Sequence, residues 1–195
     1  FNKVRCIRAK HPDEGYLRVK KTGADRRTNF FFEEGDFPVP GENENPELVL
    51  LHDWSISRIP VKAIDTEEDQ LFTVDSIGAK QPDFFNIDNW EPDPRYFLEN
   101  SMEFLDYDYE WYFDADEKRI YLILPESFDP NEAEMVIPVS DGLIKLKGEE
   151  GNTLKNIHFK GITFSGIVPG NYLIWVIAVF RPAILIRGLH GIAGL

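Results

Sequence analysis

Carboxylate side chains are the groups in this sequence whose type and position best suit chemistry on a sugar. Glycoside hydrolysis requires two carboxyl groups that face each other across the sugar, one as proton donor and one as base or nucleophile. Because the chain holds 34 aspartates and glutamates, their presence alone indicates nothing. Glu99 and Glu110 are sharper candidates, since Glu99 closes an aromatic run before Asn100 and Glu110 directly precedes Trp111. We take these two glutamates as the candidate catalytic pair.

The same residues also have a structural interpretation. Asn100 and Glu99 can satisfy backbone groups at a turn, as short polar side chains do. Trp111 can fill a core, which is the common role of tryptophan in a β domain. We favour the structural interpretation and keep the catalytic one as the alternative.

Exposed tryptophans would offer flat apolar faces to sugar rings. Trp90 lies in a polar loop, 76–91, that is rich in Asp, Asn and Pro, and Trp111 stands beside Glu110. These two are the candidate carbohydrate-binding residues, although packing remains the alternative for both. The loop either overlies a groove or is an ordinary surface connection.

The sequence contains no recognisable motif for a disulfide, a metal site, a nucleotide site or a serine nucleophile. Cys6 is the single cysteine, which excludes a disulfide within the chain and a site of several cysteines. Asp114 and Asp116 are reminiscent of a calcium loop, but its sixth-position glycine and twelfth-position glutamate are missing, so we interpret 114–119 as a turn. No phosphate loop, dinucleotide motif or Gly-x-Ser-x-Gly elbow is present. We therefore predict no metal site and no cofactor, and the four histidines have no ligand spacing: His11, His52, His158 and His190.

Composition limits the partners. The formal net charge is −13, and an acidic surface repels phosphate backbones, so nucleic acid is not an expected partner. The hydrophobic content of 43% supports a packed core. Tyr172–Phe180 is an unbroken apolar run, but a bilayer span needs about 20 residues. Arg181 and Pro182 interrupt any longer span, so none is predicted.

The elements that must position these residues are predicted to be strands. Apolar runs are short and end at Asp, Gly, Pro or Asn, which is typical of an all-β chain. Residues 111–124 form the clearest hairpin, and 96–105 could contain one or two helical turns. At Gly161 the alternation changes phase, so we expect a bend there. The expected strands are 1–10, 16–20, 30–33, 47–53, 54–61, 71–74, 95–100, 111–113, 120–124, 134–139, 143–147 and 154–164.

The order of these runs resembles a known family. The passages RYFLEN, FLD, EWYFD, RIYLILP, VIPV, GLIKLKG and NIHFKGITFSG occur in the order seen in bacterial right-handed parallel β-helix proteins of the glycoside-hydrolase type, which have a pectin lyase-like fold. The resemblance covers about residues 4–166 and is densest over 95–166. The family usually has Pro-Gly before the Glu-Trp pair. This chain has Asp108-Tyr109, which removes the usual signal for a tight turn.

The resemblance implies a domain organisation. Residues 1–139 would be a β-rich, sandwich-like insertion, and 140–166 the first coils of a right-handed parallel β-helix. The segment 167–195 departs from the family and is an atypical apolar tail. A shifted reading frame, an artificial boundary and a genuine buried strand are its three interpretations. We expect Tyr172–Phe180 not to continue the stacking expected at Asn156–Phe164.

The resemblance also implies a function. The chain would be an internal fragment of a glycoside hydrolase that degrades a polysaccharide or acts on a glycoconjugate, secreted to the extracellular space or periplasm. The family's catalytic carboxylates would lie on later coils, so the fragment alone would be inactive. The alternatives are a non-catalytic β module for carbohydrate binding or adhesion, and a truncated product without activity.

Overall fold

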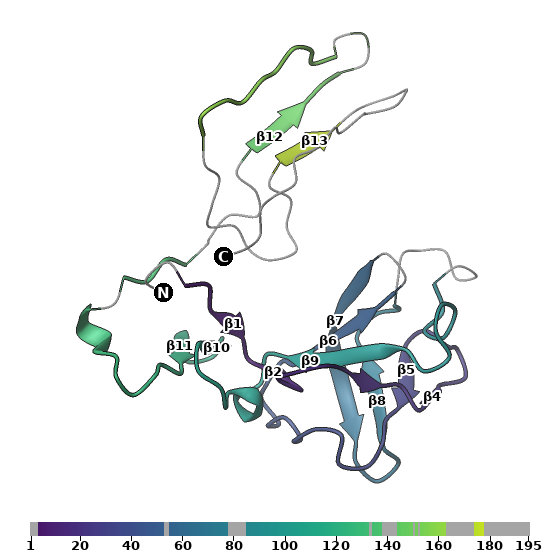
Figure 1. Ribbon diagram of the computed structural model, residues 1–195. Helices are drawn as coiled ribbons and strands as arrows, with labels where there is room; N and C mark the ends of the chain where they lie inside the picture. Colours follow the sequence, from purple (N-terminus) through teal and green to yellow (C-terminus); the bar gives the residue numbers. More distant parts are fainter. Residues whose placement is uncertain are drawn as a thin grey trace. The chain divides into compact units, whose positions relative to one another are not determined.

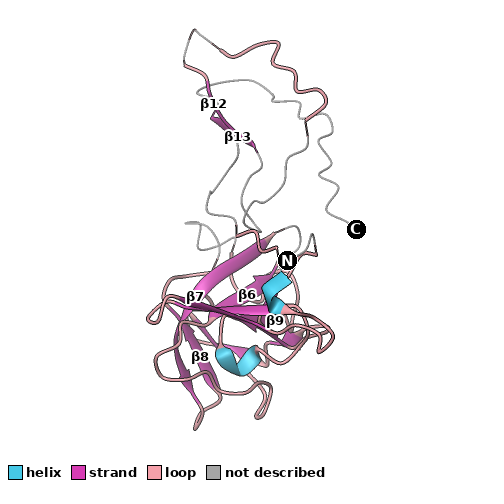
Figure 2. Ribbon diagram, turned by 90° about the vertical axis from the view of Figure 1, so that its left-hand side faces the viewer, coloured by secondary structure: helices cyan, strands magenta, loops and turns pink. Residues whose placement is uncertain are grey.

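Strands make up nearly all of the regular structure in the computed structural model of this chain (Figures 1 and 2). The structure describes residues 4–52, 55–77, 85–132, 134–137, 144–149, 151, 153–162 and 174–177. Within them, helical structure is limited to two three-residue 3-10 turns, η1 (Met102–Phe104) and η2 (Pro130–Glu132). No helix in this part of the chain has the length and apolar character needed to cross a membrane. The prediction of an all-β chain is confirmed.

The chain divides into two compact units, Phe1–Ala133 and Glu134–Leu195. The sequence analysis placed the corresponding boundary after residue 139. The first unit contains a large sheet of eight strands and a small sheet of three. The described residues of the second contain one two-stranded sheet.

The large sheet has the strand order β2-β9-β6-β7-β8-β5-β4, and β3 also pairs with β9. Neighbouring strands in it are antiparallel. In chain order its strands are β2 (Lys10–His11), β3 (Leu17–Arg18), β4 (Lys21–Thr22), β5 (Asn29–Phe31), β6 (Glu47–Leu51), β7 (Ile56–Asp65), β8 (Gln70–Thr73) and β9 (Arg95–Glu99).

Strand β7 turns the large sheet around the core. Its first half pairs with β6 and its second half with β8, and the register shifts between Val61 and Ala63. An irregularity of this kind bends a strand and lets it serve two halves of a sheet. As a result Phe30 of β5 meets Tyr96 of β9, with ring centroids 4.9 Å apart, although three strands separate β5 from β9 in the sheet order.

The core fills the inside of this bend. Phe30, Tyr96, Leu48, Leu50 and Leu98 are fully buried there. Burying a large side chain contributes about 1.5–3 kcal/mol, so such a cluster supplies the main drive for folding the first unit. On β9, Tyr96 and Leu98 point into the core because alternate residues of a strand share a face.

The region 96–105 is mostly extended. The sequence placed Phe97, Leu98 and Met102 on one helical side, but β9 puts Phe97 and Leu98 on opposite faces, and only η1 is helical. Of the one or two helical turns that the sequence predicted here, the structure contains one, the 3-10 turn η1. Pairing of β9 with β2, β3 and β6 outweighs the local helical spacing.

The small sheet contains the predicted hairpin. Strands β10 (Glu110–Asp114) and β11 (Arg119–Leu122) are antiparallel, and β1 (Ile7–Arg8) adds to β10 in parallel. In the turn, the carboxylate of Asp114 accepts hydrogen bonds from the backbone N–H groups of Asp116 and Glu117, at 2.9 and 2.8 Å. The turn interpretation of Asp114 and Asp116 thus agrees with the structure.

In the second unit, β12 (Ile144–Lys147) and β13 (Ile174–Ile177) pair in parallel, with Ile144 opposite Ile174. The sequence analysis had set Ile174–Ile177 apart from the coils. Two of the expected strands are absent from the described residues, because 134–137 and 153–162 have no regular structure. Their apolar side chains are exposed, and without an adjacent strand the alternation alone does not produce a sheet. The bend expected at Gly161 is present, with φ +71°.

A tight turn does precede Glu110. The backbone N–H of Glu110 donates to the carbonyl of Tyr107 at 3.2 Å, and Tyr109 has φ +66°. Tyr109 therefore occupies the position that glycine prefers in a type II turn. Hydrogen bonds from its N–H to Ile123 and from Ile7 to its carbonyl hold this conformation. The sheet imposes the turn despite the missing Pro-Gly signal.

We predict that Tyr109→Gly is more stable than Tyr109→Ala by about 1 kcal/mol, because a Cβ in the left-handed region is strained and glycine relieves that strain. The usual order in a strand is the reverse, with alanine ahead of glycine. Urea denaturation of the two variants measures the difference. Equal stabilities, or a more stable alanine variant, would contradict a left-handed Tyr109.

Candidate functional site

The two candidate catalytic glutamates lie in different surroundings. Glu99, only 6% exposed, ends β9 and makes ion pairs with Arg58 and, at 3.7 Å, with Arg8. Arg8 also pairs with Glu47 at 2.5 Å. Glu47 and Glu99 are directly opposite each other on β6 and β9, where like charges destabilise a sheet. The two arginines offset that repulsion, so Glu99 belongs to a structural charge network.

Asn100 supports this interpretation. It follows β9 with φ +69°, a conformation that asparagine tolerates better than most residues. Its side-chain amide donates to the backbone carbonyl of Asn45 at 2.7 Å, and its backbone N–H donates to Ala9. Asn100 thus satisfies a backbone group at a turn, whereas Glu99 binds guanidinium groups instead.

Glu110 and Trp111 do not share a site, because successive side chains of a strand point to opposite faces. Glu110 is 3% exposed and its Oε2 accepts from the backbone N–H groups of Asp106 and Tyr107, at 3.3 and 3.4 Å. Trp111 is half-buried, and the guanidinium of Arg8 lies 6.0 Å from its ring centroid. A cation therefore lies over the ring that was expected to stack on sugar.

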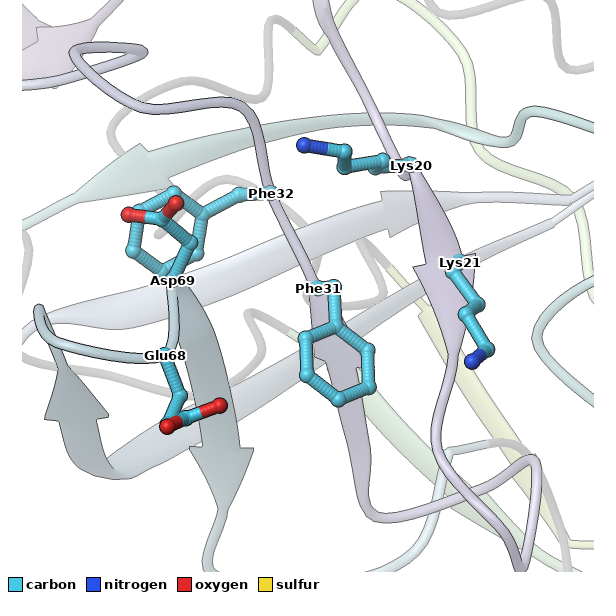
Figure 3. A pocket seen from close by; sticks show the side chains of 6 residues that line it. All are labelled: Lys20, Lys21, Phe31, Phe32, Glu68 and Asp69. Atoms are coloured by element: carbon cyan, nitrogen blue, oxygen red, sulfur yellow. The ribbon is translucent and has the colours of Figure 1, made fainter.

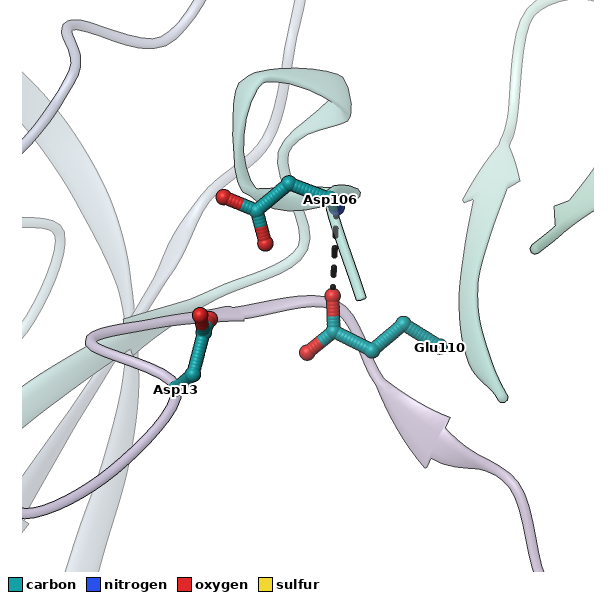
Figure 4. A group of neighbouring side chains, drawn as sticks. All are labelled: Asp13, Asp106 and Glu110. Carbon is teal, nitrogen blue, oxygen red and sulfur yellow. Dashed lines mark hydrogen bonds between the residues drawn. The ribbon is translucent and has the colours of Figure 1, made fainter. Parts of the chain in front are cut away.

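Glu110 instead faces two aspartates (Figure 4). One carboxylate oxygen from each of Asp13, Asp106 and Glu110 lies within 4.8 Å of the others. Asp13 comes from the turn after β2, Asp106 follows η1, and Glu110 begins β10. Sequence reasoning missed this cluster, because the three residues are brought together by strand pairing rather than by spacing.

Close packing of these carboxylates disfavours their charges. Burial raises the pKa of Glu110, its two backbone hydrogen bonds oppose the shift, and the charges of Asp13 and Asp106 add to it. Burial also raises the pKa of Asp106, and the nearby charge of Asp13 raises it further. A proton on this cluster is therefore favoured relative to isolated carboxylates.

The cluster is poorly placed for catalysis or for metal binding. A separation of about 5–5.5 Å between carboxyl groups suits a retaining glycosidase, and this spacing is close to it. Glu110, however, is almost fully buried, so a sugar cannot reach it. Calcium takes about six to eight oxygen ligands, and the cluster offers three carboxylates.

A pocket of about 340 Å³ lies elsewhere in the first unit, between β4, β5 and the turn before β8 (Figure 3). Phe31 is one of the side chains that line it, and the ammonium group of Lys21 is 5.6 Å from the Phe31 ring centroid. Its volume is at the low end for ligand pockets, which are mostly apolar. Charged side chains line much of it, and it contains none of the residues singled out from the sequence: its lining is Lys20, Lys21, Phe31, Phe32, Glu68 and Asp69.

The outer face of the large sheet, across β2, β3, β9, β6 and β7, is richer in functional groups. We call it the basic face, because five basic side chains lie on it: Arg8, Lys10, Arg18, Arg58 and Arg95. Strand alternation places Phe97 among them, opposite Val49 of β6. Val49 is fully buried but lies outside the main core, so this face has side-chain packing of its own. The period-two pattern of Arg95–Glu99 was the available sequence signal.

Trp90, the other candidate sugar-binding residue, is 37% exposed. It immediately precedes Glu91, which makes ion pairs with Arg18 and, at 3.0 Å, with Arg95. The segment that carries Trp90 is therefore attached to the edge of the basic face. The structure brings Trp90 near this face and leaves Glu110 away from it.

We predict that Glu99→Gln lowers the free energy of unfolding by about 1–3 kcal/mol, because it leaves Arg8 and Arg58 without their shared carboxylate. Breaking a fully buried pair costs about 3–5 kcal/mol, but here both arginines reach solvent. Urea denaturation is the measurement, and Glu103→Gln on the exposed side of η1 is the control. Equal effects of the two changes would show that the network adds no stability.

We predict that Glu110→Gln is at least as stable as the wild type at pH 7. The raised pKa of Glu110 means that its folded state is favoured below the unfolded pKa and loses stability as pH rises through the folded pKa. Glutamine keeps an acceptor and avoids this loss, so its advantage should shrink below the ordinary glutamate value of 4.5. Thermal melts from pH 3.5 to 7.5 test this, with Glu132→Gln at an exposed position as the control. An advantage that grows on acidification would contradict it.

Comparison with known proteins adds information at the level of the fold. No protein-family model matches the sequence, and no curated protein matches it. A solved structure described as a glycoside hydrolase has a TM-score of 0.60 and 20% sequence identity to this chain. The match covers 83% of this chain and 30% of that one, so the chain spans less than a third of that protein. This similarity confirms a glycoside-hydrolase-like fold, the coarser part of the predicted resemblance.

Proposed function

We propose that this chain is part of a β-helix glycoside hydrolase that acts on a polysaccharide or glycoconjugate in the extracellular space or periplasm. The observation that carries the proposal is the fold similarity to a glycoside hydrolase over 83% of the chain. The first unit is then the inserted β-rich domain, and the second begins the right-handed parallel β-helix.

The second unit supports the β-helix part of the proposal. Strands β12 and β13 are parallel and in register, and residues 148–173 connect them. Parallel neighbours need such a long crossover, as successive coils of a solenoid provide. Ile157, Phe159 and Ile162 are between 40% and 60% exposed, and a solenoid buries such side chains by stacking further coils.

The catalytic carboxylates are proposed to lie outside the described residues. Glu99 is held by arginines and Glu110 is buried against backbone N–H groups, so neither is presented to a sugar. A β-helix builds its groove from side chains on several stacked coils, and the described part of this chain contributes a single strand pair. The fragment then lacks a facing pair of accessible carboxyls.

We predict that the isolated chain hydrolyses no glycoside. The test is incubation of residues 1–195 with plant and algal polysaccharides, followed by a reducing-end assay. Glu99→Gln and Glu110→Gln are made in parallel and checked for folding by circular dichroism. Turnover that both substitutions abolish, with folding intact, would overturn the prediction and make these glutamates the catalytic pair.

A non-catalytic carbohydrate-binding or adhesion module is the second candidate function. The exposed aromatic and cationic side chains of the basic face favour it, because they lie on rigid strands of the first unit. Binding of a polysaccharide without turnover would support the binding-module function. A truncated product without activity would show neither binding nor turnover.

A further inference from the structure

His52 combines burial with an unsatisfied ring nitrogen. It directly follows β6 and is 8% exposed. Nε2 of its ring is hydrogen-bonded to the hydroxyl of Ser57 at 2.7 Å, whereas Nδ1 is buried and has no hydrogen-bond partner among the described residues. Buried polar atoms are nearly always paired in folded proteins, so an unpaired ring nitrogen needs a physical explanation.

The ring lies where the pairing of β6 with β7 ends. Ser57 of β7 is directly opposite Leu50 of β6, which is a fully buried core residue. The backbone N–H of His52 donates to the carbonyl of Ser55 at 2.8 Å and so closes the connection between the two strands. The ring also packs edge-on against Phe85, with centroids 6.0 Å apart. We call His52, Ser57 and Phe85 the His52 latch.

The charged groups on the elements around the latch are engaged elsewhere or lie at a distance along the strand. Burial lowers the pKa of His52 below its ordinary value of 6.5, and no charge of a described residue contributes to this shift. Lys62 and Asp65 lie on the second half of β7, which pairs with β8. The other charged groups are held in ion pairs: Glu47 with Arg8, Arg58 with Glu99, and Asp88 with Arg26.

Protonation changes both nitrogens of the ring. A neutral imidazole has one donor and one acceptor, while an imidazolium has two donors and a positive charge. Nδ1 of a protonated His52 is then a buried N–H without an acceptor among the residues that the structure describes. The positive charge likewise has no carboxylate partner among them. Both consequences favour a conformation in which the ring reaches water.

We propose that the His52 latch is a pH-sensitive switch of the first unit. With a neutral ring, the latch keeps the end of the β6–β7 pair closed. When the ring takes up a proton, it leaves Ser57 and Phe85 for solvent, and the pairing of Leu51 with Ile56 opens. The core cluster does not include His52 and stays packed, so the opening is local. The switch does not depend on which ligand the protein binds.

The direction of the pH effect follows from the position of the proton. A group whose pKa is lower in the closed form stabilises that form above its ordinary pKa and loses the contribution as the pH falls. Opening should therefore increase below pH 6.5, by up to about tenfold for each pH unit, until the pKa of the closed form is reached. The raised pKa of Glu110 has the opposite sign, because protonation there favours the folded state.

The test is hydrogen exchange of the full chain between pH 7.5 and 5.5, read by mass spectrometry. Protection factors are used because they correct for the intrinsic pH dependence of exchange. We expect peptides that cover β6 and residues 56–59 to lose protection at least about threefold on acidification, while peptides of the β10–β11 hairpin keep theirs. Unchanged protection of β6, or an equal loss in the hairpin, would overturn the switch.

Two histidine variants locate the titrating group. His52→Gln keeps a side chain that can hydrogen-bond to Ser57 but cannot take up a proton in this range, so the pH dependence should disappear. His158→Gln is the matched control, because His158 is exposed, and it should behave as the wild type does. Persistence of the pH dependence in His52→Gln, or its loss in His158→Gln, would refute the assignment.

Two further measurements cover the remaining outcomes. If His52→Gln does not fold, titration of the His52 ring in the wild-type chain by NMR replaces it: a midpoint below 6.5 supports the switch, and one above 6.5 overturns it. Asp53 is the nearest carboxylate along the sequence. Asp53→Asn should leave the pH dependence unchanged, and its loss in that variant would assign the titration to Asp53 instead of the latch.

Discussion

The carboxylate of Glu99 is the charge on which the arrangement of the first unit depends. It is nearly buried at the end of β9, directly across from Glu47 of β6. Burying a carboxylate is unfavourable unless it is paired. Arg8 of β1 and Arg58 of β7 provide that pairing. The network therefore ties β1, β6, β7 and β9 together, and through Arg8 it reaches Trp111 of the hairpin.

The side chains of strand β9 alternate between the core and the outer face of the large sheet. Tyr96 and Leu98 point inward and complete the core, which exists only because β7 bends the sheet around it. Arg95, Phe97 and Glu99 point outward and form the middle of the basic face. Because Tyr96 and Leu98 are anchored in the core, the adjacent residues of β9 are held at fixed positions on the opposite face. A rigid sheet face is better suited than a loop to hold charges at fixed spacing.

The two candidate catalytic glutamates, Glu99 and Glu110, lie in different electrostatic surroundings. Glu99 is paired with two arginines, whereas Glu110 lies beside Asp13 and Asp106 and has a raised pKa. Neither environment presents an accessible acid and base to a sugar. The fold of this chain resembles that of a solved structure described as a glycoside hydrolase.

The sequence by itself determined the all-β class, the hairpin within 111–124, the turn at Asp114 and the bend at Gly161. Each of these depends on the local alternation of apolar and polar residues or on residues that favour turns, and both can be read from a short stretch of sequence. It did not predict the turn at Tyr109, because hydrogen bonds from distant strands impose it.

Only the tertiary structure decided which residues meet. The cluster of Asp13, Asp106 and Glu110 and the network of Glu99 with its arginines join residues far apart in the sequence. The absence of strands over 134–137 and 153–162 was also decided there, since an alternating run becomes a strand only when a neighbour supplies hydrogen bonds. Spacing along a chain carries no information on which strand becomes that neighbour, and the bend in β7 sets it for the first unit.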